Sequence, residues 1–297
     1  MVLKSKVKKR SKNILNILMF VLPAAIPLSV FWVGPMIKSI LISFTDWDYM
    51  TSNYNIVGLA NYKALFEDTM FYNALKNTFV FTLGTLIPTI AGGLAIAVIL
   101  KNKIKGSALY KAIIFSPWIT PTVAISIVWS WILEPRYGFA NYILQMFNLP
   151  KSNWLQSSDT AMLGVIIVTV WKGLGWAMIF YLTALERVPN ELYEAASVDG
   201  ANGWNKFKSI TLPLISPTTF FLTIITTINS LQAYDQIQVL TQGGPSGSTR
   251  TILYMYYQAA FETFNIGEAT AIATVILGIT GVLAVIQFIA SKRWVHY

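Results

Sequence analysis

Residues Thr160 to Leu185 read TAMLGVIIVTVWKGLGWAMIFYLTAL, and one charged residue, Lys172, interrupts an otherwise uncharged stretch. A helix that crosses the hydrocarbon core of a bilayer needs ~20 apolar residues, and this stretch is long enough. Further uncharged runs of similar length are Ile14 to Ile37, Asn77 to Leu100, Ala112 to Leu133, Ser209 to Tyr234 and Ala269 to Ser291. These runs lack the alternation of barrel strands, so their backbones must satisfy their hydrogen bonds as helices. The sequence therefore predicts an all-α integral membrane protein with six transmembrane helices.

The chain is expected to form a single transmembrane domain over residues 1–297. The expected helices lie at about 14–44, 74–100, 109–133, 160–186, 209–234 and 268–291, and a cytoplasmic loop is expected at 187–208. Pro117 and Pro121 fall within the third of these helices and are expected to kink it.

Composition agrees with a membrane protein and excludes several kinds of chemistry. The 297 residues are 55% hydrophobic and 12% charged, whereas a soluble domain carries about 25% charge. The sequence has no cysteine and one histidine, His296. A thiolate zinc site, a histidine metal cluster and a Ser-His pair are therefore poor hypotheses. We expect no catalytic residue, no metal site and no enzymatic activity in this chain.

Basic residues are unevenly distributed among the segments that connect the expected helices. A basic stretch, Lys4 to Lys12, precedes the first helix, and more lysines and arginines lie at 101–111, at 187–208 and after the last helix. The excess of basic residues marks the cytoplasmic side. Both termini are thus predicted to be cytoplasmic, and the net charge of +9 follows from topology rather than from a nucleic-acid partner.

The loop between the fourth and fifth helices holds all the acidic residues of the predicted cytoplasmic face. They are Glu186, Glu191, Glu194 and Asp199. Pro189 and Asn190 signal the start of a short helix, and Gly200 permits a turn after it. An acidic cluster on a basic face favours a docking surface for another protein. The alternative is an amphipathic connector on the lipid headgroups, which acidic side chains disfavour.

Several motifs resemble those of one transporter family. Glu194-Ala195-Ala196, Asp199-Gly200 and Ile210-Thr211-Leu212-Pro213 resemble the EAA loop of the permease subunits of binding-protein-dependent ABC importers. The carbohydrate-uptake branch, typified by the maltose permeases, has motifs similar to Ser43-Phe44-Thr45-Asp46-Trp47, Val57-Gly58-Leu59-Ala60-Asn61-Tyr62, Ala74-Leu75-Lys76-Asn77-Thr78 and Leu240-Thr241-Gln242-Gly243-Gly244-Pro245. The resemblance covers nearly the whole chain.

This resemblance implies a type I ABC importer permease fold in the bacterial cytoplasmic (inner) membrane. It implies a multi-pass permease subunit that forms half of a pathway for sugars, with oligosaccharides favoured. The expected partners are a second related permease in a heterodimer, two ATPase subunits, an extracytoplasmic solute-binding protein and the lipid bilayer. The implied ATPase-coupling residues are Glu191, Glu194, Ala195, Ala196, Asp199 and Gly200. Because the chain has no G-x-x-x-x-G-K-[ST] motif, ATP and Mg²⁺ are expected on the partner ATPase, with no cofactor here.

Polar residues inside the predicted spans suggest where a solute passes, because such residues usually face a cavity or a helix neighbour. Lys172 lies near the middle of the fourth span, and an aromatic ring such as Trp176 can pack against a sugar ring. The predicted pathway residues are Thr169, Lys172, Gly173, Trp176, Thr226, Asn229 and Ser230. The alternatives are a lysine satisfied by a carbonyl or carboxylate, and hydroxyls that bond to neighbouring helices.

Two other functions remain open. One is an ABC permease for another polar solute, such as glycerol phosphate. The other is a self-sufficient secondary transporter or channel, for which an intramembrane carboxylate or an inverted repeat would be expected. No Asp or Glu lies within the six uncharged runs, and no clear repeat is evident.

Overall fold

The computed structural model describes residues 19–51, 53–101 and 106–295. Within these ranges the chain forms helices and loops, with one isolated bridge between Thr45 and Ile56. The helices are α2 (Gly34–Ile42), α3 (Ala60–Glu67), α4 (Thr69–Lys101), α5 (Ser107–Ile119), α6 (Thr122–Ile132), α7 (Phe139–Met146), α8 (Ala161–Glu186), α9 (Asn190–Val198), α10 (Gly203–Lys206), α11 (Leu212–Leu214), α12 (Ser216–Leu231), α13 (Asp235–Leu240), α14 (Ile252–Tyr257) and α15 (Ile266–Ser291). The basic stretch from Lys4 to Lys12, the predicted helix start at residue 14 and His296 lie outside the described residues.

Four described helices are long and apolar enough to cross a membrane. They are Met19–Ile42, α4, α8 and α15. Two further segments reach this length only as bent pairs of helices, α5 with α6 and the segment Gly203–Leu214 with α12. The described chain therefore contains four straight candidate spans, or six if each bent pair counts as one.

The segment predicted as one helix at 109–133, kinked at Pro117 and Pro121, forms two separate helices in the structure. α5 and α6 meet at an angle of 101°. Thr120 lies at the break with an extended backbone, ψ 137°, as expected for a residue whose α conformation is hindered by a following proline, Pro121. The predicted helix at 209–234 is also interrupted, by a bend of 63°, and its last residues, 232–234, lie beyond the end of α12.

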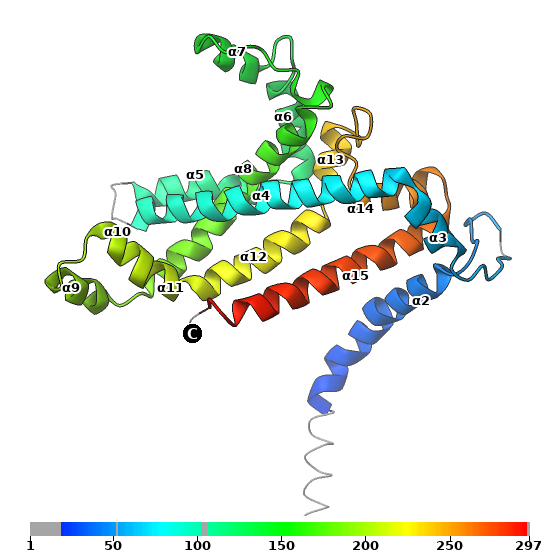
Figure 1. Cartoon of the computed structure of the whole chain (residues 1–297), viewed down its shortest axis with the longest axis horizontal. Helices are drawn as coiled ribbons and strands as arrows, with labels where there is room; N and C mark the ends of the chain where they lie inside the picture. Colours follow the sequence, from blue (N-terminus) through cyan, green and yellow to red (C-terminus); the bar gives the residue numbers. More distant parts are fainter. Residues whose placement is uncertain (1–18, 52, 102–105, 296–297) are drawn as a thin grey trace, which may run out of the picture.

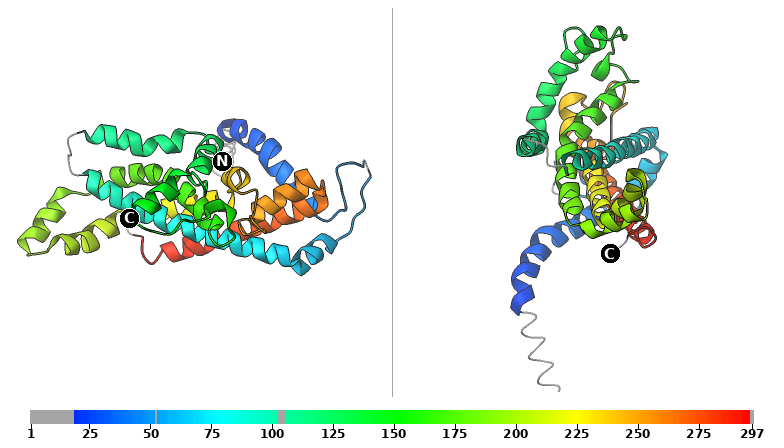
Figure 2. Two further views of the ribbon diagram at one scale, coloured as in Figure 1. Left: turned by 90° about the horizontal axis from the view of Figure 1, so that it is seen from above. Right: turned by 90° about the vertical axis from the view of Figure 1, so that its left-hand side faces the viewer.

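α8 packs between α4 and α5, and α12 lies against α4 and α8 (Figures 1 and 2). Glycines permit the close approach of α8 to both neighbours. A Cβ on Gly93 of α4 would lie 2.5 Å from the Cβ of Ala177, and a Cβ on Gly175 would lie 2.1 Å from the Ile114 carbonyl oxygen. Small residues bring helix backbones together in membranes, where packing rather than hydrophobic burial holds helices together. α4, α5 and α8 thus form a tightly packed unit.

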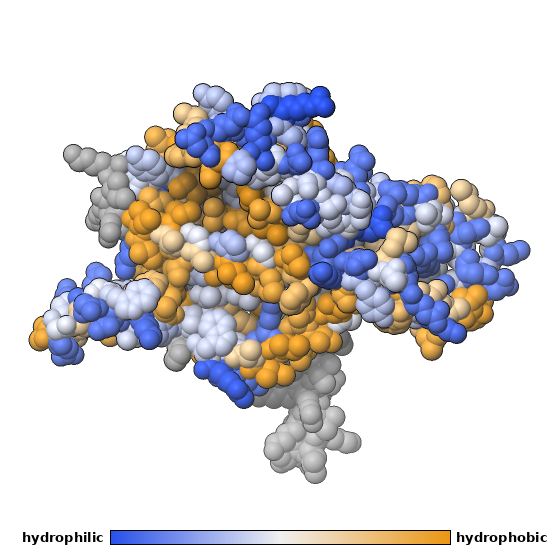
Figure 3. All heavy atoms as spheres, turned by 45° about the horizontal axis from the view of Figure 1, so that its top comes forward, coloured by the Kyte–Doolittle hydropathy of each residue, from blue (hydrophilic) through white to orange (hydrophobic). Residues whose placement is uncertain are grey.

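The two ends of the molecule differ. α9 and α10 project from one end, whereas α3 and the loop before it lie at the other, and α15 ends near α11 (Figure 1). Apolar residues gather over the middle of the face shown in Figure 3, and hydrophilic residues gather around the loops at the right. Helix Met19–Ile42 contacts α15 through α2 and then leads away from the bundle, with Phe31 and Trp32 each 75% exposed.

Candidate functional site

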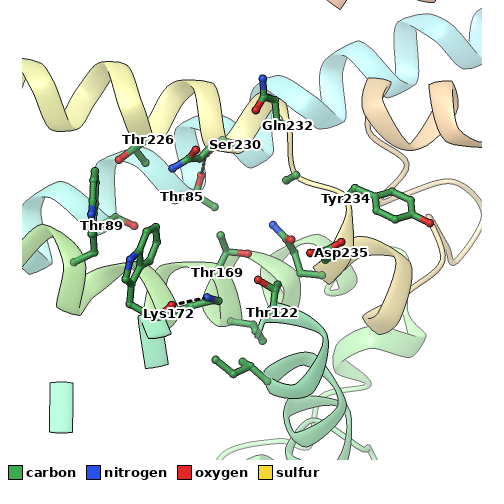
Figure 4. A pocket seen from close by; sticks show the side chains of 18 residues that line it. Thr85, Thr89, Thr122, Thr169, Lys172, Thr226, Ser230, Gln232, Tyr234 and Asp235 are labelled. Carbon is green, nitrogen blue, oxygen red and sulfur yellow. Dashed lines mark hydrogen bonds between the residues drawn. The ribbon is translucent and has the colours of Figure 1, made fainter. Parts of the chain in front are cut away.

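A cavity of about 380 Å³ lies in the middle of the helix bundle (Figure 4). It is lined by residues of α4, α5, α6, α8, α12 and α13. All the residues predicted for the solute pathway line it, namely Thr169, Lys172, Gly173, Trp176, Thr226, Asn229 and Ser230. The structure therefore brings the predicted residues of α8 and α12 together around one space, while their role in binding a solute stays a prediction.

One wall of the cavity is aromatic. Trp118 of α5 stacks on Trp176 of α8, with ring centroids 5.2 Å apart and planes at 24°. Phe180 lies one helical turn further along α8. The centroid of its ring is 4.9 Å from that of Trp176 and 5.2 Å from that of Phe221 in α12. The aromatic surface thus continues from the cavity along α8 in the direction of α9. Flat apolar faces of this kind can pack against the C–H faces of sugar rings.

Lys172 reaches the broken end of α5. Its Nζ donates a hydrogen bond to the Trp118 carbonyl oxygen at 3.2 Å and lies 5.2 Å from the centroid of the Trp118 ring. Because the chain bends after Ile119, this carbonyl belongs to the last turn of α5, where carbonyls lack helical partners. A positive charge is favourable at such a helix end. Lys172 therefore stabilises the bend and also lines the cavity (Figure 4).

The rest of the lining carries hydroxyl and amide groups. The hydroxyl of Thr85 in α4 hydrogen-bonds to that of Ser230 in α12 at 2.8 Å, and both residues are buried. Thr169 donates to the Val165 carbonyl within α8 at 2.8 Å. Within the described residues, no hydrogen bond engages the side chains of Thr226 or Asn229, which leaves their donors and acceptors available to a ligand.

Sequence reasoning did not select the cavity residues that come from α4, α5 and α6. They are Thr85, Thr89, Trp118, Thr122 and Ile125. The threonines of α4 recur at Thr78, Thr82, Thr85 and Thr89, a spacing that places them along one helical stripe. That stripe of threonines was the sequence pattern from which the cavity-lining residues of α4 could have been predicted. For α5 and α6 no comparable signal exists, because the bend decides which residues face the cavity.

The predicted coupling loop forms a short helix, α9, with a well-defined end. Glu191 lies in its first turn, where a negative charge is favoured. At its end Gly200 has φ +78°, its N–H donates to the Ser197 carbonyl at 3.1 Å, and the Ala201 N–H donates to the Ala196 carbonyl at 2.8 Å. This pair of bonds is the Schellman motif, in which glycine adopts the left-handed conformation at no steric cost.

Five of the six predicted coupling residues are exposed and Ala196 is half-buried. The exposed ones are Glu191, Glu194, Ala195, Asp199 and Gly200. Two apolar side chains that sequence reasoning did not select lie beside them, Val198 at 88% exposure and Trp204 at 68%. An exposed surface with acidic residues around apolar ones, at one end of the molecule (Figure 1), has the composition of a protein contact.

The described residues contain no group of three or more His, Cys, Asp or Glu side chains that could hold a metal ion. Among the described residues, the cavity is lined by one lysine and one carboxylate, Asp235, and no ion pair within 4.0 Å joins them. The lining combines hydroxyls, amides and indole rings with one positive and one negative side chain, a composition that can bind a polar small molecule.

Comparison with known proteins agrees with this geometry. Residues 84–295 match the family described as "Binding-protein-dependent transport system inner membrane component". The trehalose/maltose transport system permease protein MalF of Thermococcus litoralis is 34% identical, with 93% of each chain covered. The multiple sugar-binding transport system permease protein MsmF of Streptococcus mutans is 33% identical over 89% of this chain and 91% of its own.

A solved structure with the same fold is also similar to this chain. It is a chain from the crystal structure of a bacterial alginate ABC transporter in complex with an alginate pentasaccharide-bound periplasmic protein. The TM-score is 0.82 at 24% identity, and 96% of each chain is covered.

Proposed function

The chain belongs to the family of inner membrane components of binding-protein-dependent transport systems, and from this premise we propose that it is one permease half of an ATP-driven oligosaccharide importer. The observation that carries the proposal is the central cavity, where indole rings face hydroxyl and amide groups. Its volume of about 380 Å³ falls within the usual range for small-molecule sites, ~300–1,000 Å³. Relatives named for multiple sugars and for trehalose and maltose support a saccharide as the solute.

The solute is proposed to contact the side chains of α8 and α12 that line this cavity. Trp176 would pack against a sugar ring, and Thr226 and Asn229 would hydrogen-bond to sugar hydroxyls. Lys172 would place a positive charge beside the solute, a charge that suits saccharides with carboxylate groups. Asn229 and Thr226 have donors and acceptors to spare, which supports this assignment.

We propose that each bent helix pair crosses the bilayer once, as a type I importer fold requires, so that the chain has six spans. The exposed α9 then faces the cytoplasm, and both termini lie on that side because the number of spans is even. The position of the end of α15 near α11, toward the end that carries α9, supports this orientation (Figure 1). The excess of basic residues around α9 and after α15 supports it as well.

The power for transport is proposed to come from partner subunits. α9, with Glu194, Ala195 and Gly200 on its exposed surface, would insert into a separate ATPase. A second permease would complete the pathway, and an extracytoplasmic binding protein would deliver the solute. The complex of the bacterial alginate ABC transporter with an alginate pentasaccharide-bound periplasmic protein supports such a partner. Alternating access would then be a rigid-body movement of helices around the cavity.

The experiment is to purify the chain with its native partners, reconstitute the complex in nanodiscs and measure ATP hydrolysis. The binding protein is offered maltotriose, trigalacturonate or sn-glycerol 3-phosphate in separate assays. We expect one of the two trisaccharides to stimulate hydrolysis. Stimulation by glycerol phosphate alone would change the proposed solute, and accumulation of solute by the isolated chain without an ATPase would refute the importer mechanism.

A further inference from the structure

Tyr193 is the main side chain by which α9 rests on the transmembrane bundle. Within α9, Tyr193 and Ala196 are half-buried and every other residue is exposed. The Tyr193 ring packs against a buried cluster that includes Leu100 of α4, Leu185 of α8 and Ile215. A displacement of α9 must therefore pass largely through this side chain to reach the bundle.

Two specific contacts tie Tyr193 to two different elements. The Nζ of Lys101, the last residue of α4, lies 4.7 Å from the centroid of the Tyr193 ring, within the range of a cation–π attraction. The Tyr193 hydroxyl and the Thr211 hydroxyl share a hydrogen bond of 2.8 Å. In the described part of the chain, the other side-chain bond from α9 to another helix joins Ser197 to Lys206 of α10 and does not reach the bundle.

Both elements held by Tyr193 lead to the central cavity. α4 contributes Thr85 and Thr89 to the lining. Thr211 is buried just before α11, in the segment Gly203–Leu214, which a 63° bend joins to α12. α12 contributes Thr226 and Ser230 to the lining. The two helices meet again at the cavity, through the hydrogen bond between Thr85 and Ser230.

We propose that Tyr193 is a positioning residue that transmits the displacement of α9 to α4 and α12. The proposal rests on the proposed function, because α9 is displaced when an ATPase grips it. To transmit a displacement of α9 in both directions, its contact with the bundle must resist separation as well as compression. Packing alone resists compression, whereas separation must be resisted by attractive contacts. The ring attracts Lys101 at the end of α4, and the hydroxyl bonds to Thr211 in the segment that leads into α12, so an attractive contact lies on the path to each cavity-lining helix.

The test compares two variants at this position in the complete transporter reconstituted in nanodiscs. Tyr193→Phe removes the hydroxyl bond and keeps the ring over Lys101, whereas Tyr193→Leu removes both contacts. The measured quantity is the factor by which the binding protein, loaded with the trisaccharide that stimulates the parent, increases ATP hydrolysis. We expect Tyr193→Phe to lower that factor by about 3- to 10-fold, from the net contribution of one hydrogen bond. Tyr193→Leu should lower it further.

Tyr181→Phe is the matched control. Tyr181 belongs to the same buried cluster, and its hydroxyl donates to Thr219 of α12 at 3.1 Å, but it lies on α8 and not on α9. We expect this variant to keep the stimulation factor of the parent. Basal ATP hydrolysis and the amount of ATPase that co-purifies report whether each complex is assembled.

The proposal is overturned if both Tyr193 variants keep the stimulation factor within twofold of the parent, or if Tyr181→Phe loses as much as Tyr193→Phe. If Tyr193→Leu does not assemble, Lys101→Met decides, because it removes the contact to α4 and leaves α9 unchanged. A loss of stimulation in Lys101→Met supports the proposal, and a parental value refutes it. Failure of the parent complex to respond to any trisaccharide refutes the proposed function instead.

Discussion

Replacing Gly175 with alanine should push α5 away from α8. A Cβ at this position would lie 2.1 Å from the Ile114 carbonyl oxygen and 2.7 Å from the Cα of Phe115. Carbon–oxygen contacts between packed helices ordinarily lie at ~3.3 Å or beyond, so α5 must retreat by about 1 Å. Both neighbouring atoms belong to the backbone, which cannot rotate out of the way as a side chain can.

The effect of this displacement of α5 on the free energy of unfolding can be estimated. Overpacking of this kind destabilises a protein by ~1–3 kcal/mol, and alanine regains up to ~1 kcal/mol of helix propensity relative to glycine. The matched control is Gly281→Ala in α15, where an added Cβ meets no atom within 4 Å. Gly175→Ala should therefore be less stable than Gly281→Ala by roughly 2 kcal/mol, measured by SDS or thermal unfolding of the complex in detergent.

The same change should impair transport, because α5 carries Trp118. Moving α5 separates the ring of Trp118 from that of Trp176. It also moves the Trp118 carbonyl oxygen away from the Nζ of Lys172. We expect Gly175→Ala to reduce stimulated ATP hydrolysis, while Gly281→Ala keeps the parental response. Equal stability and equal activity of the two variants would refute the inference that α5 and α8 meet backbone to backbone.

Three further predictions concern other parts of the chain. Gly200→Val should lose co-purifying ATPase, because a non-glycine residue at φ +78° costs ~1–2 kcal/mol. Gly203→Val is the control, and equal retention of the ATPase by both variants would contradict the coupling assignment. Lys172→Met should lower uptake of trigalacturonate relative to maltotriose, since it removes the one Lys or Arg among the described cavity-lining residues; an unchanged ratio would count against an acidic solute. The pKa of Asp46 lies below its ordinary value of 3.8 because the Asn55 backbone and side-chain amides donate to its carboxylate. The resulting stabilisation is present above pH 3.8 and is lost as the pH falls through the lowered pKa. The hydrogen-exchange protection of residues 46–51 and 53–55, relative to the intrinsic exchange rate at each pH, should therefore fall only below that pH, and Asp46→Asn should lose this dependence.

The sequence was sufficient to predict the polar residues of α8 and α12 that line the cavity, and the reason is physical. A lysine, an asparagine and hydroxyls are costly in hydrocarbon, so their presence inside apolar runs indicates a shared polar space. Lys172 and Asn229 are of this kind, and both line the cavity. Helix α9 was predictable because Pro189 and Gly200 act locally, through the backbone conformations they favour.

The 101° bend and its consequences were not predictable from the sequence. Proline disfavours the α conformation of the preceding residue, but it does not set the angle at which the chain resumes. That angle depends on contacts far away in sequence, such as the bond from Lys172 to Trp118 and the packing of α6 on α13. Trp118 was missed for this reason, although it forms half of the aromatic wall.

Tyr193 was also missed, because its neighbours in sequence are the exposed residues that define the loop motif. A half-buried tyrosine in a short amphipathic helix looks like ordinary packing. Its importance depends on its contacts with Lys101 and Thr211. Lys101 precedes Tyr193 in the sequence and Thr211 follows it, so both come close to Tyr193 only in the folded chain.

The stacked pair Trp118 and Trp176 gives this protein an intrinsic optical reporter. Two indoles with centroids 5.2 Å apart and planes at 24° couple their electronic transitions, and the coupling changes with their separation and angle. Among the ten tryptophans of the chain, this signal can be isolated by subtracting the near-ultraviolet circular dichroism of Trp118→Phe from that of the parent. Spectra recorded with and without ATP would then report any change in the separation or angle of these two rings without any attached label.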